Sequence, residues 1–227
     1  MKAAVLAALY RSQLDLDMPV LVFDTFPSVR AGTTFRNCIE MDSDPEPWRR
    51  LGSHATLRWL ANRMITRSSN LATNLCLHQL GLAAVAQVWK SAGATHSATN
   101  RLIEDYAANN IGITNVVTAA DLTRLFLSLR PDELDLLALN EYRVDLAAGL
   151  PLGIRIAFKN GWFPGLRHSA GIVYPDDTAP YAIAVCYTGA LATGHAINDP
   201  AAQVIAQISA NIWTQRHKLD PPMNPMG

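Results

Sequence analysis

The sequence has little of several features that mark specialised classes of protein. It holds three cysteines, Cys38, Cys76 and Cys186, which lie far apart and form neither a Cys-x-x-Cys pair nor a cluster with histidine. This pattern argues against a disulfide framework and against a zinc site. We predict that the cysteines are small core residues and that the protein uses no metal and no other cofactor.

An excess of charge of one sign and a long apolar run are also lacking. Lys plus Arg and Asp plus Glu each number 19, so no overall field draws the chain to nucleic acid, and no dense basic run does so locally. No apolar stretch is long enough to span a bilayer. The sequence does have 49% hydrophobic residues over 227 positions, which suffices for a sizeable core in one large domain or two interleaved lobes.

The first ten residues are apolar on nearly every face from Lys2 to Tyr10, which predicts a buried helix. A signal peptide is the alternative, but eight apolar residues followed by Arg11, without a small-residue cleavage pattern, match it poorly. A buried helix with no cap and no chain before it suggests that sequence is missing before Met1. We therefore expect an N-terminally truncated form of a longer protein.

Apolar periodicity predicts a mainly helical lobe over 1–150, with helices at Thr56–Ile65, Leu71–Leu80, Ala83–Ala92, Ala119–Leu129 and Asp132–Leu146. Residues 15–48 predict loops with minor strands, and Asp42–Pro47 within them predicts a surface turn. The segment Thr99–Asn110 lacks an apolar stripe and predicts an ordered loop, either solvated or functional.

The pattern changes to strands after Gly149. An antiparallel meander is expected from Ile154–Phe158, Ala170–Tyr174 and Tyr181–Tyr187. An amphipathic helix over Pro200–Arg216 would cover one sheet face. We expect one α/β (α+β) domain over 1–227, with the sheet and last helix in 151–216 and a disordered tail over 217–227.

Three polar elements stand at junctions of these predicted structures. Lys2 heads the first helix, Ser68–Asn70 separates two helices, and Lys159–Gly161 ends a strand. Ser and Asn at a helix start are commonly caps. In this order, however, the elements are similar to the S-x-x-K, S-D-N and K-T-G elements of class A β-lactamases and penicillin-binding proteins. The resemblance covers nearly the whole chain and implies their fold, a helical lobe beside an antiparallel sheet.

The resemblance also implies roles in acyl transfer to a serine, which needs a base, a proton for the leaving nitrogen and oxyanion donors. Lys2 would activate the nucleophile, since burial can lower the pKa of a lysine. Ser68 would relay the proton to the leaving nitrogen, while Lys159 would hold that hydroxyl and the substrate carboxylate. Asn70 would bind the substrate amide carbonyl, and the Trp162 backbone N–H would be an oxyanion donor.

Hydrolysis of an acyl-enzyme requires a carboxylate that positions a water molecule. Glu104 lies in the loop where class A enzymes keep this base, with Asp105 as a second choice. The usual E-P-x-x-N pattern is absent, because Asp105 stands in place of the Pro and Asn109 is an approximate counterpart of the final Asn. If Glu104 does not reach the site, slow deacylation and penicillin-binding behaviour would follow.

Other departures concern the binding residues and the nucleophile. Ser69 replaces the Asp of S-D-N, and Asn160 replaces the Thr before Gly161 in K-T-G. Asn160 and Gly161 remain implied substrate contacts, and Arg167 is either a contact to the substrate carboxylate or a solvated residue. Only Met1 precedes Lys2, so the serine of S-x-x-K is not among these residues.

We therefore expect a serine hydrolase that opens β-lactam rings through an acyl-enzyme and is inactive as printed. The alternatives are a non-catalytic binding protein with this fold and a D-alanyl-D-alanine peptidase or penicillin-binding protein. The implied partner is a small β-lactam or a D-Ala-D-Ala-like peptide, with neither nucleic acid nor a membrane span.

The resemblance also implies that the first sheet strands are missing, which would leave an unpaired edge and lower the stability. The sequence leaves the compartment open: as printed the chain would be cytoplasmic, whereas the family is usually exported.

Overall fold

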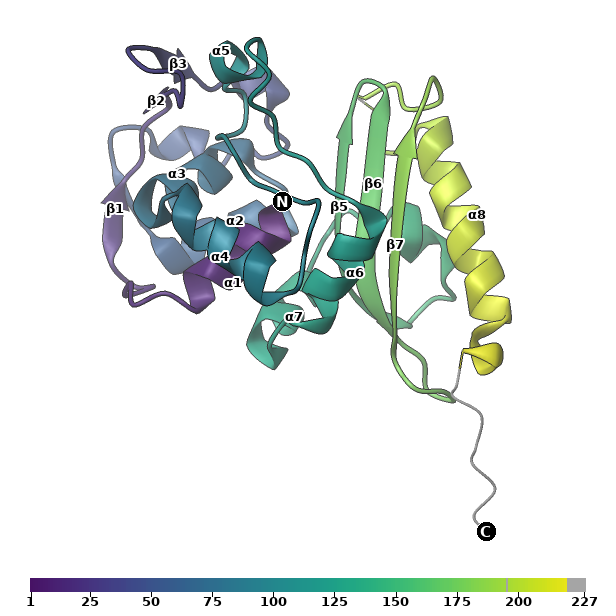
Figure 1. The fold of residues 1–227 in the computed structure, drawn as a ribbon. Coiled ribbons are helices and arrows are strands. Elements are labelled where there is room, and N and C mark those ends of the chain that lie inside the picture. The colour runs from purple at the N-terminus through teal and green to yellow at the C-terminus, as the bar shows by residue number, and fades with distance from the viewer. Residues whose placement is uncertain (195, 220–227) are drawn as a thin grey trace. The chain divides into compact units, whose positions relative to one another are not determined.

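The computed structural model describes residues 1–194 and 196–219. The chain divides into two compact units, Met1–Glu141 and Tyr142–Gly227. Helices dominate the first unit, whereas the second consists mainly of an antiparallel sheet and one long helix (Figure 1). The expected α/β class is confirmed.

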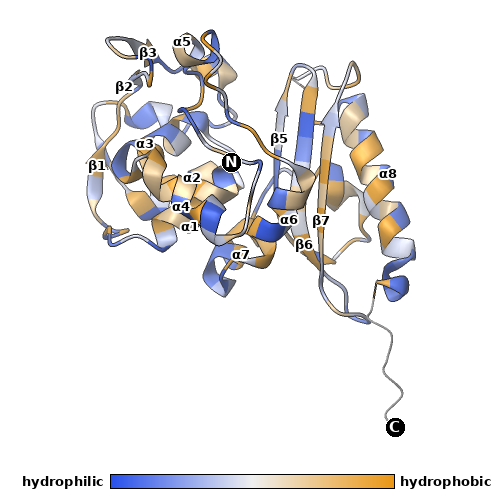
Figure 2. Ribbon diagram, in the orientation of Figure 1, coloured by the Kyte–Doolittle hydropathy of each residue, from blue (hydrophilic) through white to orange (hydrophobic). Residues whose placement is uncertain are grey.

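The first unit is built around α1 (Lys2–Tyr10), in which Ala3 to Leu9 are all buried. This helix packs against α3 (Asn70–Leu80) and α4 (Leu82–Ser91), and α2 (Leu57–Thr66) packs against α1 and α3. Figure 2 shows the apolar character of α1. The helix is buried as its sequence predicts, because it has no polar face that could be turned to water.

Short elements complete this unit. They are the paired strands β1 (Pro19–Leu21) and β4 (His54–Thr56), the paired strands β2 (Thr25–Pro27) and β3 (Thr34–Arg36), and the helices α5 (Tyr106–Asn109), α6 (Ala119–Leu127) and α7 (Pro131–Ala138). The expected helix Asp132–Leu146 is wrong in its second half, since α7 ends at Ala138. Asp145 has a φ of 57°, which an α-helix excludes, and begins a 3-10 turn, Asp145–Gly149.

The three cysteines differ in their surroundings. Cys76 is buried as predicted, and burial raises the pKa of its thiol to about 12. Cys38 is exposed and its Sγ lies 2.8 Å from Glu40 Oε2, while Cys186 is half-buried. The prediction of three core cysteines is therefore wrong for Cys38.

The second unit holds the strands β5 (Arg155–Phe163), β6 (Leu166–Tyr174) and β7 (Tyr181–Thr188), paired antiparallel in the order β5-β6-β7. The strands β5 and β6 are longer than predicted because the polar residues after Phe158 continue the ladder, with Asn160 opposite Ser169 and Gly161 opposite His168. The helix α8 (Pro200–Thr214) lies along one face of this sheet (Figure 1).

The core of the second unit lies between that helix and the sheet. It is formed by Leu146, Ala147, Ile156, Phe158, Val173, Ile183 and Ile205. A 3-10 turn, Arg216–Lys218, follows α8, and the rest of the predicted tail, residues 220–227, lies outside the described residues.

Over the described ranges no single helix is long and apolar enough to cross a membrane. The helices α3 and α4 pass such a test only as a pair, and they are bent by 91° at their break. The same part of the chain holds no group of three or more His, Cys, Asp or Glu side chains able to bind a metal ion.

Candidate active site

The first unit brings together three of the residues that the sequence analysis singled out. Lys2 opens α1, Ser68 follows α2 and Asn70 opens α3. The Lys2 amine lies 3.2 Å from Ser68 Oγ and 3.0 Å from Asn70 Oδ1, and it also donates to the Ser68 carbonyl. The amine and the two polar side chains thus form a hydrogen-bonded cluster between helix starts that are far apart in the sequence.

The chemistry of this cluster depends on the charge of Lys2. Burial lowers the pKa of Lys2 from 10.5 to about 8, although the carboxylates of Asp42 and Glu104 act in the opposite direction. Part of the amine is therefore neutral near neutral pH, and a neutral amine accepts a proton from a hydroxyl group. The hydrogen bond to Ser68 Oγ gives a path for such a transfer.

Glu104 joins the cluster and Asp105 does not. The buried carboxylate of Glu104 accepts from Asn70 Nδ2 at 3.1 Å and from the Cys38 backbone N–H at 2.7 Å. Asp105 instead caps α5 and accepts from Ser28 Oγ at 2.7 Å. Of the two acids that the sequence offers, Glu104 is therefore the one hydrogen-bonded to Asn70.

Asn70 connects the members of the cluster. Its Oδ1 accepts from Lys2, while its Nδ2 donates to Glu104 and, at 3.0 Å, to the Met41 carbonyl. Because the carboxamide oxygen accepts a hydrogen bond and the nitrogen donates two, the orientation of the side chain is fixed. Asn70 thus couples the basic and acidic groups of the site.

Asp42 also lies at this cluster, although the sequence analysis placed it in a surface turn. Its carboxylate accepts from Ser69 Oγ at 3.1 Å, from Asn70 N at 3.0 Å and from Leu71 N at 2.9 Å. No local pattern around Asp42 indicates this contact. The one feature of the sequence that could have indicated Asp42 is Ser69, because S-D-N carries an acid at that position and this chain does not, so an acid from another segment could take its place.

Lys159 and Asn160 lie in β5 of the second unit on opposite faces of the sheet, as strand geometry requires. Lys159 is 8% exposed, and its amine donates to the Asn160 carbonyl at 3.1 Å. The Asn160 side chain is buried, and its Nδ2 donates to Asp145 Oδ2 at 3.0 Å and to the Tyr142 carbonyl at 3.1 Å. The amide of Asn160 is thus used inside the unit, and the expected substrate contact from Asn160 stays a prediction.

Gly161 and Trp162 follow in the same strand. Gly161 is exposed and pairs with His168 across the ladder. The Trp162 ring meets the Tyr142 ring edge-on, with the centroids 5.5 Å apart. The ring is thereby held in place, while the oxyanion role of the Trp162 backbone N–H stays a prediction.

Arg167 is not solvated, so that expectation is corrected, whereas its contact to a substrate carboxylate stays a prediction. Its side chain is fully buried, with Nε 2.6 Å from Asp145 Oδ1 and Nη1 3.2 Å from Asp199 Oδ1. The guanidinium also donates to the carbonyls of Ala196 and Ile197. Two carboxylates and two carbonyls compensate the desolvation of the cation, so Arg167 holds the second unit together.

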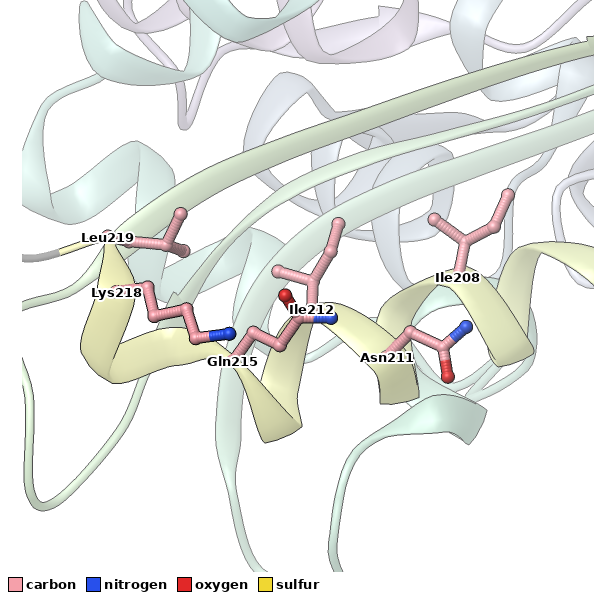
Figure 3. A pocket seen from close by; sticks show the side chains of 6 residues that line it. All are labelled: Ile208, Asn211, Ile212, Gln215, Lys218 and Leu219. Carbon is pink, nitrogen blue, oxygen red and sulfur yellow. The ribbon is translucent and has the colours of Figure 1, made fainter.

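A shallow hollow of about 250 Å³ lies on α8 and the turn after it (Figure 3). It is lined by Ile208, Asn211, Ile212, Gln215, Lys218 and Leu219. None of these is a predicted site residue, and the lining offers a single charged group. The hollow therefore adds nothing to the acyl-transfer chemistry.

Ser68 provides a test of strain in the site. Its φ of 58° is in the left-handed region, which costs a non-glycine residue about 1 kcal/mol. Ser68→Gly and Ser68→Ala both delete the hydroxyl, but only the glycine relieves the strain. We expect Ser68→Gly to be more stable than Ser68→Ala by about 1 kcal/mol in urea unfolding. Equal stabilities of the two variants would show that the backbone at Ser68 is not strained.

Comparison with known proteins identifies the family and the fold. Residues 3–215 match the model of the β-lactamase enzyme family. The fold is similar to that of PBP-A, with 21% identity, a TM-score of 0.74 and coverage of 96% of this chain and 79% of that chain. A class A β-lactamase from Mycobacterium abscessus is 20% identical, with a TM-score of 0.71 and coverage of 94% and 83%.

A variant of the last common ancestor of Gram-negative bacteria class A β-lactamase is 25% identical, with a TM-score of 0.71 and coverage of 96% of this chain and 82% of that chain. A search of curated proteins gave no match. The family model spans most of the chain and includes the Ser68–Asn70 and Lys159–Gly161 elements. The chain belongs to the β-lactamase enzyme family.

Proposed function

We propose that this site serves the opening of β-lactam rings through an acyl-enzyme. The observation that carries the proposal is the position of the Lys2 amine, within hydrogen-bonding distance of both Ser68 Oγ and Asn70 Oδ1, with Glu104 on the other side of Asn70. A base, a proton relay, a carbonyl-binding amide and a second carboxylate are the groups that the two half-reactions need.

In the first half-reaction a serine hydroxyl gives its proton to the neutral Lys2 amine, and its oxygen bonds to the lactam carbonyl carbon. The lactam C–N bond then breaks, and the nitrogen takes a proton from Ser68 Oγ, which Lys2 reprotonates. The resemblance assigns to Lys159 the positive charge that would attract the substrate carboxylate. The ring is thereby opened and remains attached to the serine as an ester.

In the second half-reaction Glu104 takes a proton from a water molecule while the water oxygen attacks the ester carbonyl. The ester bond breaks, and the serine oxygen recovers the proton that Glu104 took from the water. Each oxygen of Glu104 accepts one hydrogen bond within the first unit, from Asn70 Nδ2 or from the Cys38 N–H. A carboxylate oxygen has a second acceptor position, so Glu104 keeps the capacity to accept a hydrogen bond from a water molecule.

The reacting serine is the test of the proposal. The 227 residues hold only Met1 before Lys2, so by themselves they provide no serine at the S-x-x-K position. We compare an N-terminal extension that places Ser three positions before Lys2 with a matched extension that places Ala there. The serine form should be labelled covalently by a fluorescent penicillin, and the alanine form and the printed chain should not. If the serine form is folded but not labelled, the proposal fails.

The pH dependence of labelling checks the role of Lys2. The active form of Lys2 is the neutral amine, which predominates above its pKa of about 8. The labelling rate of the serine form should therefore rise as the pH increases through about 8 and level off above it. A rate that is the same at pH 6 and pH 9 would exclude Lys2 as the base.

The fate of the label separates a β-lactamase from a penicillin-binding protein or D-alanyl-D-alanine peptidase. Chromogenic cephalosporin turnover with rapid loss of the label supports the β-lactamase. A label that persists for hours together with cleavage of a D-Ala-D-Ala peptide supports the peptidase. Reversible binding of penicillin without labelling supports a non-catalytic binding protein.

A further inference from the structure

The start of α3 is held by two acceptors, of which one comes from a distant segment. Ser69 is the ordinary cap, since its Oγ accepts from Ala72 N at 3.1 Å. The Asp42 carboxylate takes the preceding donors, with Oδ1 3.0 Å from Asn70 N and Oδ2 2.9 Å from Leu71 N. Asp42 therefore caps two N–H groups that Ser69 leaves without a partner, and its segment makes further contacts with this helix start.

The further contacts of the Asp42 segment involve both Ser69 and Asn70. The Ser69 hydroxyl donates to Asp42 Oδ2, and Trp48 Nε1 donates to the same oxygen at 3.0 Å. The Met41 carbonyl, one residue earlier, accepts from Asn70 Nδ2. Residues 41 and 42 therefore hold both the backbone and the side chain of Asn70, whose Oδ1 accepts from Lys2.

We propose that Asp42 supplies, from a separate segment, the carboxylate that the S-D-N element carries at the position of Ser69, and that it positions Asn70 and Lys2 through it. In this chain the acid lies in the loop, at Asp42, and the hydroxyl group lies at the helix start, at Ser69, where S-D-N carries its acid. The carboxylate also interacts favourably with the Lys2 ammonium and with the positive end of α3. The effect of Asp42 on catalysis rests on the proposed function, whereas its effect on the start of α3 and on the pKa of Lys2 does not.

If the acid and the hydroxyl group have exchanged positions, a second substitution that restores the S-D-N arrangement should compensate for the loss of the Asp42 charge. Asp42→Asn keeps the size of the side chain but removes its charge, and Ser69→Asp alone puts two carboxylates side by side. The double variant Asp42→Asn/Ser69→Asp restores one carboxylate and one neutral partner. Each single variant should therefore lose more thermal stability than the double variant. In the serine-bearing extended form, penicillin labelling should fall in Asp42→Asn and recover in the double variant.

The pKa of Lys2 gives a readout that requires no substrate. The chain has four lysines, so carbon-13 NMR of labelled lysine follows Lys2 directly in the printed chain. Loss of the Asp42 charge should lower the pKa of Lys2 by about one unit, and the double variant should restore it. Glu104, the other acid beside Lys2, is unchanged in all these variants.

Asp105→Asn is the matched control, because Asp105 is a buried acid that caps α5 in the same unit. It should lower stability without changing the pKa of Lys2. The proposal is overturned if Asp42→Asn leaves this pKa unchanged, or if the double variant is no better folded and no closer to the original pKa than Asp42→Asn. A different result would contradict the proposed function instead: the pKa of Lys2 falls in Asp42→Asn and is restored in the double variant, but penicillin labels no serine-bearing form.

Discussion

Replacement of Arg167 by methionine is expected to lower the free energy of unfolding by about 3–5 kcal/mol. Methionine fills most of the volume but leaves the carboxylates of Asp145 and Asp199 without their shared cation, and both side chains are buried. Removal of one partner from a buried ion pair costs more than the pair contributes, because the remaining charge keeps its desolvation penalty. Urea unfolding followed by tryptophan fluorescence measures the loss.

A second arginine variant serves as the control for this loss of stability, and the loss should depend on pH. Arg216→Met removes a surface pair with Asp177 and should cost little stability, because solvent screens the attraction between exposed charges. Burial raises the pKa of Asp145, and Arg167 opposes this rise. Without Arg167 the pKa of Asp145 rises further, so lowering the pH should protonate Asp145 and relieve part of the destabilisation, which returns as the pH increases. Equal losses for Arg167→Met and Arg216→Met would refute the importance of the buried network.

Glu104→Gln is expected to slow deacylation by about 10²- to 10⁴-fold in the serine-bearing form. Glutamine keeps the shape of the side chain and one acceptor oxygen but does not take a proton from water. Acylation does not use this carboxylate as its base, so the penicillin adduct should accumulate in mass spectra rather than disappear. The measurement is the decay of the adduct after removal of free penicillin.

Asp105→Asn makes the same chemical change at the next residue and serves as the comparison. Asp105 accepts from Ser28 Oγ and from backbone N–H groups, and it lacks the contact to Asn70 that Glu104 makes. Its amide variant should lose about 1 kcal/mol of stability and deacylate at the original rate. If Asp105→Asn slowed deacylation and Glu104→Gln did not, the assignment of the base would be reversed.

Periodicity along the chain suffices for most of the fold. The apolar residues of α1 and α8 predict helices that start within one residue of those observed. The stop after Ala138 is not readable in this way, because the helical pattern continues while Asp145 takes a left-handed backbone. The strand β5 is longer than predicted because cross-strand pairing, rather than side-chain hydropathy, extends it past Phe158.

The site was predictable where chemistry coincides with helix starts and strand ends, as it does for Lys2, Ser68 and Asn70. It was not predictable where partners come from elsewhere in the chain. Asp42 lies in a Pro-rich loop whose local pattern is that of a turn, and its contact with Ser69 spans 27 positions. Arg167 has the sequence context of a solvated residue, and the acceptors that explain its burial, Asp145 and Asp199 among them, lie elsewhere in the chain.

The contact between Asn160 and Asp145 has a consequence for engineering by family consensus. Threonine is the residue that K-T-G elements carry at this position, so a consensus library would introduce Asn160→Thr as a stabilising change. Threonine has one hydroxyl donor where Asn160 uses Nδ2 for both Asp145 and the Tyr142 carbonyl. A buried acceptor would lose its partner, so Asn160 and Asp145 have to be exchanged together or kept.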